Sequence, residues 1–105
     1  MLSHYSSLKV AESIRMLEAL YPGRIDLGIA PPGGSDGLTA NALAHGLGAL
    51  GIEHFPVQIR DVQGWISGKM PKGPPFEQIT AMPAGETDPE IWLLGSIDQS
   101  AAYAA

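Results

Sequence analysis

Only two segments of this chain have the clear pattern of a β-strand, and this scarcity limits the fold more than any other feature. Residues 24–30 alternate apolar and polar side chains, as a half-buried strand does. Residues 91–94 (IWLL) form an apolar run between Pro89 and Gly95, which is typical of a strand covered on both faces. Helical patterns flank both segments, so the sequence predicts an α/β fold. Two strands cannot close a sheet, so we expect a fragment, or a protein that completes its sheet with a partner.

The clearest helical pattern covers residues 8–21, where Ser6 or Ser7 caps the start and Pro22-Gly23 ends the helix. Its apolar side chains recur at helical spacing and are predicted to form a face that is buried either on the sheet or in a dimer: Val10, Ile14, Leu17 and Tyr21.

Three further helices are expected, over residues 38–50, over residues 57–66 with Pro56 at the first position, and from residue 96 to the last residue. Residues 67–89 are rich in glycine and proline and are predicted to be an irregular excursion within a single domain, 1–105, with a brief strand at 79–82.

Composition excludes several classes of function. The 105 residues carry a net charge of −5 with only six scattered Lys and Arg, which argues against a nucleic-acid partner. There is no cysteine, so disulfides, Cys-ligated metal centres and thiol catalysis are excluded. The apolar runs are far shorter than the roughly 20 residues of a membrane span. The first residues lack the pattern of a signal peptide, so we expect a cytoplasmic protein without a membrane partner.

Three places carry residues that could bind or react. Ser96 and Ser100 follow the 91–94 strand at the start of a helix, where they could hold an anion or simply cap that helix. Gly33 to Gly37 lies between a strand and a helix, but it matches no phosphate-loop pattern and is also consistent with a plain turn. His4 precedes the first helix, either as a solvated or capping residue or as a site residue at a strand end.

Two blocks of the chain resemble the bacterial luciferase-like monooxygenases. The first block comprises SHYSSLKVAE at 3–12 and LEALYPGRIDLGI at 17–29, and the second comprises IWLLGS at 91–96 and SAAYAA at 100–105. The order of the blocks and their approximate separation also agree with the family.

The resemblance implies a partial TIM barrel, an enzyme that oxidises small organic substrates such as aldehydes with O₂, and non-covalently bound reduced FMN as cofactor. It places His4 at a strand end beside the flavin or substrate pocket, as a catalytic candidate. Ser96 and Ser100 match the flavin-phosphate site. A closed barrel takes roughly 250 residues, so we expect an incomplete set of β/α units, completed by oligomerisation or by further chain.

Two departures from the family pattern bear on activity. Ala30-Pro31 stands where the family has Gly-Arg, and Ile97 replaces a second serine. We therefore expect weakened flavin binding. The alternative hypothesis is a non-catalytic remnant that folds as a homo-oligomer, with the 8–21 helix as a plausible interface.

Overall fold

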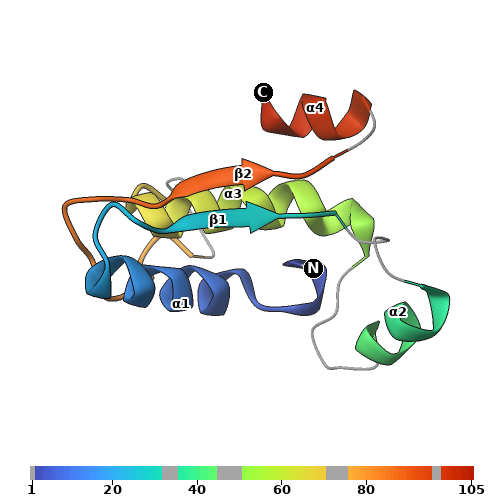
Figure 1. Ribbon diagram of the computed structural model, residues 1–105, viewed down its shortest axis with the longest axis horizontal. Coiled ribbons are helices and arrows are strands. Elements are labelled where there is room, and N and C mark those ends of the chain that lie inside the picture. The colour runs from blue at the N-terminus through green and yellow to red at the C-terminus, as the bar shows by residue number, and fades with distance from the viewer. Residues whose placement is uncertain (1, 32–35, 45–50, 71–75, 96–97) are drawn as a thin grey trace.

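The structure is a computed structural model that describes residues 2–31, 36–44, 51–70, 76–95 and 98–105 (Figure 1). Its elements alternate in the order that the sequence predicts. They are η1 (Leu2–His4), α1 (Ser7–Leu20), β1 (Asp26–Ile29), α2 (Gly37–Ala44), η2 (Ile52–His54), α3 (Phe55–Ser67), β2 (Glu90–Leu93) and α4 (Asp98–Ala104).

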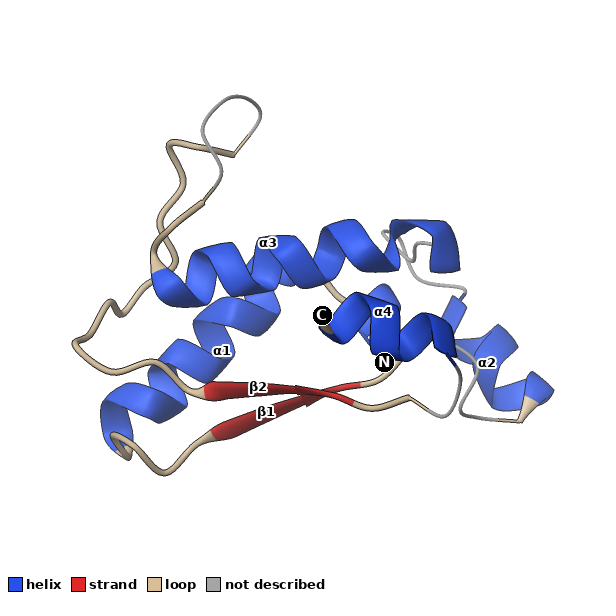
Figure 2. Ribbon diagram, turned by 90° about the horizontal axis from the view of Figure 1, so that it is seen from above, coloured by secondary structure: helices blue, strands red, loops and turns tan. Residues whose placement is uncertain are grey.

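The two strands lie side by side and parallel, with Asp26 opposite Glu90 and Ile29 opposite Leu93. A further hydrogen bond, from the Leu94 N–H to the Ile29 carbonyl at 2.8 Å, extends the pair beyond its last register position. Figure 2 shows α1, α3 and α4 on the same side of this sheet. The partial α/β character that the sequence predicts is therefore confirmed.

The other face of the sheet is open, which corrects one expectation. The 91–94 run was expected to be covered on both faces, but Trp92 is 60% exposed and points away from the helices. Gly28 lies opposite Trp92, and no atom of the described residues comes within 4 Å of the Cβ that another residue would have there. An apolar composition indicates only that both faces of a strand can be buried, and the described residues of this chain do not cover this second face.

The core lies between α1, α3 and the covered face of the sheet. Helix α3 begins with Pro56 in its first turn, as predicted, and ends at Gly68, whose φ of 71° requires a residue without a Cβ. Its buried stripe has helical spacing and consists of Phe55, Gln58, Ile59, Val62, Trp65 and Ile66. The Trp65 indole donates to the Ile79 carbonyl at 3.2 Å, which holds the following segment against α3.

Helix α1 begins where Ser6 accepts a hydrogen bond from the Lys9 N–H at 3.4 Å, so Ser6 is its cap. Its buried face differs from the predicted one: the buried residues are Ser7, Ala11, Arg15 and Glu18. Val10 and Ile14 are half-buried against the core, but Leu17 and Tyr21 are 41% and 51% exposed. The periodicity of apolar residues missed this face because charged residues occupy half of it.

Arg15 and Glu18 are buried because they have partners in the segment before β2. The Arg15 Nε donates to the Pro83 carbonyl at 3.0 Å, and its Nη1 donates to the Thr87 carbonyl at 2.8 Å and to Asp88 at 2.9 Å. We call Arg15, Glu18 and these partners the α1 clamp. Residues 79–82 do not form the predicted strand; within the described residues, 76–89 contain no helix or strand.

Glu18 completes the clamp at the turn after α1. Its Oε1 accepts from the Gly23 N–H at 2.8 Å and from the Thr87 hydroxyl at 2.7 Å, although its Oε2 has no partner among the described residues. The Gly23 amide, the Thr87 hydroxyl and the charge of Arg15 hold the pKa of Glu18 below its ordinary value, against the opposing effect of burial.

Among the described residues, helix α2 (Gly37–Ala44) confirms the first part of the predicted 38–50 helix. Asp36 caps it by accepting from the backbone N–H groups of Leu38 and Thr39 at 3.1 and 3.0 Å, which supports the plain-turn interpretation there. Residues 33–35 of that turn and residues 45–50 of the predicted helix lie outside the described residues.

Candidate functional site

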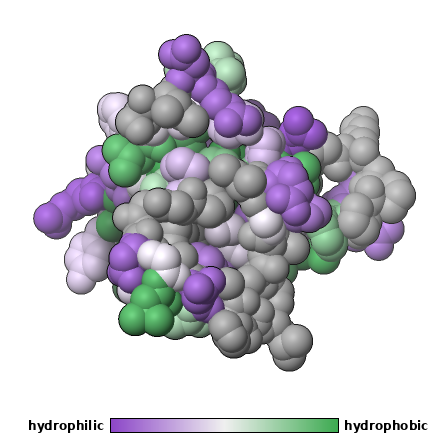
Figure 3. Space-filling model, turned by 90° about the vertical axis from the view of Figure 1, so that its right-hand side faces the viewer, coloured by the Kyte–Doolittle hydropathy of each residue, from purple (hydrophilic) through white to green (hydrophobic). Residues whose placement is uncertain are grey.

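The carboxyl ends of β1 and β2 meet at one end of the molecule, together with η1 and the starts of α2, α3 and α4 (Figure 1). Loops at the carboxyl ends of parallel strands are the usual place for binding sites in α/β folds. Figure 3 looks onto this end, where hydrophilic and hydrophobic side chains are interspersed among the coloured residues.

His4 is the last residue of η1, a 3₁₀ turn and not the expected strand end, and it lies at this end of the molecule. Its ring is half-buried, and neither Nδ1 nor Nε2 has a hydrogen-bond partner among the described residues, although both atoms are shielded from solvent. The adjacent Ser3 hydroxyl is buried in the same way and also lacks a partner there. Most buried polar atoms in native proteins are paired, so these three atoms have hydrogen-bonding capacity open to a ligand or to ordered water.

Gln58 holds the turn that carries His4, and sequence reasoning missed it. Its side-chain Nε2 donates to the carbonyls of Leu2 and Tyr5, each at 3.4 Å. The sequence does contain a signal for this residue. Gln58 is polar, but it lies three positions after Phe55 and four before Val62, inside the apolar stripe of α3. A glutamine in a buried stripe requires hydrogen-bond partners, because an unpaired amide is costly to bury.

A groove of about 220 Å³ runs beside the carboxyl half of β1. It is apolar, and its walls come from η1, α1 and β1: Leu2, Tyr5, Val10, Leu27, Gly28, Ile29 and Ala30. The groove confirms that the turn carrying His4 lies against the end of β1, although His4 itself does not line it. Ala30 follows β1 directly where the family pattern has the glycine of Gly-Arg.

Ser100 lies in the first turn of α4, beyond the end of β2, and is buried. Its side chain packs directly against Gly95, so closely that a Cβ on Gly95 would overlap the Ser100 Cβ. Asp98, exposed in the same turn, places a negative charge nearby. The structure therefore brings Ser100 to the same end of the sheet as His4, whereas Ser96 and Ile97 lie outside the described residues.

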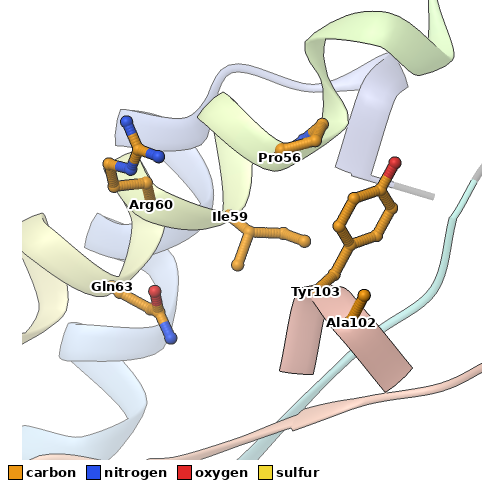
Figure 4. A pocket seen from close by; sticks show the side chains of 6 residues that line it. All are labelled: Pro56, Ile59, Arg60, Gln63, Ala102 and Tyr103. Carbon is orange, nitrogen blue, oxygen red and sulfur yellow. The ribbon is translucent and has the colours of Figure 1, made fainter. Parts of the chain in front are cut away.

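A second cavity, of about 230 Å³, opens between α3 and α4 (Figure 4). Its lining is formed by Pro56, Ile59, Arg60, Gln63, Ala102 and Tyr103, with Tyr103 pointing from α4 toward α3. The Tyr103 ring also packs edge-on against Phe55, with centroids 6.1 Å apart. Of the predicted site residues that the structure describes, neither His4 nor Ser100 lines this cavity, so we treat it as separate from the candidate site.

Other site classes find no support in the described part of the chain. No group of three or more His, Asp or Glu side chains there is arranged to hold a metal ion. The described helices include none with the length and apolar character needed to cross a bilayer. His54 is exposed, and His45 lies outside the described ranges.

Comparison with known proteins identifies relatives over the whole chain, although no family model matches it. The chain is 41% identical over 105 residues to uncharacterized protein YwcH of Bacillus subtilis, covering 100% of this chain and 31% of YwcH. It is 38% identical over 106 residues to the luciferase-like monooxygenase of Escherichia coli K12, covering 100% of this chain and 30% of that protein. The N-acetyl-S-alkylcysteine monooxygenase of B. subtilis is 34% identical over 105 residues, covering 100% of this chain and 31% of the enzyme.

The fold agrees with these relationships. The crystal structure of apo-MsnO8 superposes with a TM-score of 0.78 at 35% sequence identity, covering 100% of this chain and 30% of that one. The chain thus spans about 30% of the length of the relatives it matches. By sequence and by structure, it belongs to the luciferase-like monooxygenases and corresponds to part of the length of their members.

Proposed function

We propose that this chain provides part of the flavin and substrate pocket of an FMN-dependent monooxygenase that acts on a small organic substrate with O₂. The observation that carries the proposal is the pair of buried ring nitrogens of His4, which have no partner among the described residues, at the end of the molecule where Ser100 also lies. Because the chain is related to monooxygenases, we take a flavin or its substrate as the hydrogen-bond partner of these nitrogens.

The residues at this end fit a flavin in part. The His4 imidazole can both donate and accept a hydrogen bond, so it would orient the flavin or the substrate from the pocket wall. The Ser100 hydroxyl, with that of Ser96, would donate to the flavin phosphate. Ala30-Pro31 supplies no cation, and Asp98 adds a negative charge, so we expect this phosphate site to be weak. Reduced FMN, when bound, supplies the electrons for the reaction with O₂, while the protein provides orientation and excludes water.

Titration of the purified chain with FMN, followed by flavin fluorescence, tests the proposal. We expect a dissociation constant of tens of micromolar or weaker, because the family cation and second serine are missing. Ser96→Ala should weaken binding about tenfold, and Ser100→Ala somewhat less, since each removes a hydrogen bond to a charged group. Ser13→Ala, which removes a hydroxyl bonded only to the Lys9 carbonyl on α1, is the matched control and should leave the affinity unchanged.

Two outcomes would contradict this assignment. If flavin fluorescence shows no saturable change up to millimolar FMN, the isolated chain does not bind flavin. An unchanged affinity in Ser96→Ala would make that serine a helix cap and leave the phosphate site unassigned.

The uncovered apolar surface favours a second candidate function, a non-catalytic protein that self-associates. Large apolar side chains are exposed on several elements, and six of them lie on or directly after α1 and β2: Met16, Leu17, Leu20, Tyr21, Trp92 and Leu94. The sheet also contains only two strands among the described residues, so each strand has an edge without a strand partner there. We expect a homo-oligomer with α1 at the interface, and light scattering that gives a stable monomer of 11.0 kDa would contradict it.

A further inference from the structure

We propose that Gln58 is a positioning residue for His4, which it holds through the backbone of the η1 turn. This inference rests on the proposed role of His4 in the flavin and substrate pocket. Gln58 comes from α3, more than fifty residues away in the chain, and is 4% exposed. Its Nε2 reaches the carbonyls of Leu2 and Tyr5, the residues that bracket Ser3 and His4.

Leu2 anchors the start of this turn in the core, but few other hydrogen bonds hold the turn among the described residues. Within η1, the Tyr5 N–H donates to the Leu2 carbonyl at 3.0 Å, which closes a single 3₁₀ turn. One such turn does not fix the direction of a side chain, and the His4 ring has no hydrogen-bond partner of its own among the described residues. The Gln58 amide is thus the side-chain group from α3 that ties both ends of this turn to the rigid part of the fold.

The position of Gln58 in α3 makes this tie stiff. Its neighbours on the same stripe, Phe55 and Val62, are fully buried, so the helix cannot turn or slide without breaking the core. Gln63 lies on the same helix, is exposed, and lines the separate cavity between α3 and α4. The two glutamines therefore offer a matched pair, in which one residue contacts the His4 turn and the other does not.

Nuclear magnetic resonance of the flavin-free protein tests the positioning directly. In Gln58→Met, which keeps the side-chain length and removes both donors, we expect the His4 ring signals to shift and the Tyr5 amide to exchange faster by about fivefold or more. In Gln63→Met, both should match the wild type. Unchanged His4 signals in Gln58→Met would overturn the proposal. If Gln58→Met does not fold, the hydrogen exchange of the side-chain amide protons is measured in the wild-type protein instead. Exchange at Gln58 that is as fast as at Gln63 would also overturn the proposal.

A double-mutant cycle on FMN affinity separates positioning from a general structural role. Gln58→Met should weaken FMN binding about fivefold when His4 is present, and less than about twofold in the His4→Ala background, because coupled residues are not additive. Equal losses in both backgrounds would assign Gln58 to the scaffold alone and overturn the proposal. Wild-type protein that binds no FMN would contradict the proposed function, while the resonance experiment would still decide the role of Gln58.

Discussion

At the amino ends of β1 and β2, each buried polar side chain of the α1 clamp has hydrogen-bond partners, with only the Glu18 Oε2 atom left without one, whereas at the carboxyl ends several buried polar groups lack any partner among the described residues. The α1 clamp gives Arg15 three hydrogen bonds and gives one oxygen of Glu18 two. At the other end, the Ser3 hydroxyl and both His4 ring nitrogens are buried without a partner among the described residues. Satisfied groups of this kind hold a fold together, and unsatisfied ones retain capacity for a ligand. The comparison separates a structural end of the sheet from a binding end.

Removal of Arg15 should have the largest effect on stability. Arg15→Met leaves the Pro83 and Thr87 carbonyls without their donor, so we expect the free energy of unfolding to fall by about 3 kcal/mol. Urea unfolding measures this change. Arg60→Met, on the exposed side of α3, is the control and should change it by less than about 0.5 kcal/mol. Equal effects would show that the clamp is not the structural end of the sheet.

A methyl group at Gly95 should have the next largest effect. The new Cβ of Gly95→Ala would overlap Ser100, so we expect a loss of about 1–3 kcal/mol in urea unfolding and a disturbed α4. Gly28→Ala is the matched control, because nothing among the described residues lies within 4 Å of its Cβ. A loss in Gly28→Ala as large as in Gly95→Ala would mean that the open sheet face is covered in solution.

The charge of Glu18 should be visible as a pH dependence of stability. A carboxylate whose pKa is lowered by folding stabilises the native state above its unfolded pKa, and this contribution disappears as the pH falls through the folded pKa. Glu18→Gln retains an acceptor for Gly23 and Thr87, so its stability should fall less steeply on acidification than that of the wild type. Urea unfolding at a series of acidic pH values measures the two slopes. If the free energy of unfolding fell with the same slope in the wild type and in Glu18→Gln, the charge of Glu18 would not contribute to the stability of the clamp.

The smallest effect is expected for Leu17→Ala. Sequence periodicity predicts a core residue and a cost of about 2–5 kcal/mol, but a side chain that is 41% exposed should cost less than about 1 kcal/mol in the monomer. Unfolding at low and high protein concentration shows whether Leu17 lies on the surface of a monomer or in an interface between copies. A loss that grows with concentration would place Leu17 in an interface between copies, and a large loss at every concentration would contradict its exposure.

Local patterns predicted most of the elements, and distant partners account for the errors. The limits of α1 and α3 follow from neighbouring residues, Ser6 and Pro56 among them, so they could be read from the sequence. The burial of Arg15 could not, because its acceptors lie about seventy residues later in a segment without periodicity. Gln58 was missed for the same reason, since its partners precede it by more than fifty residues. The places of His4 and Ser100 beside predicted helix starts singled them out, the resemblance assigned their roles, and the position of Ser96 stays a prediction.

The parallel pairing of residues 26–29 with 90–93 also has a consequence for how the chain folds. The sheet can form only after the intervening chain has closed into a long loop, and such non-local pairing slows folding. The cost of closure rises slowly with length, by about 0.6 kcal/mol for each doubling, so changes of length between α3 and β2 should affect the folding rate more than stability. Arg15 binds Thr87 and Asp88 just before β2. These contacts with α1 would therefore place β2 beside β1 in the correct register. We therefore expect the docking of residues 83–88 on α1 to precede the formation of the sheet.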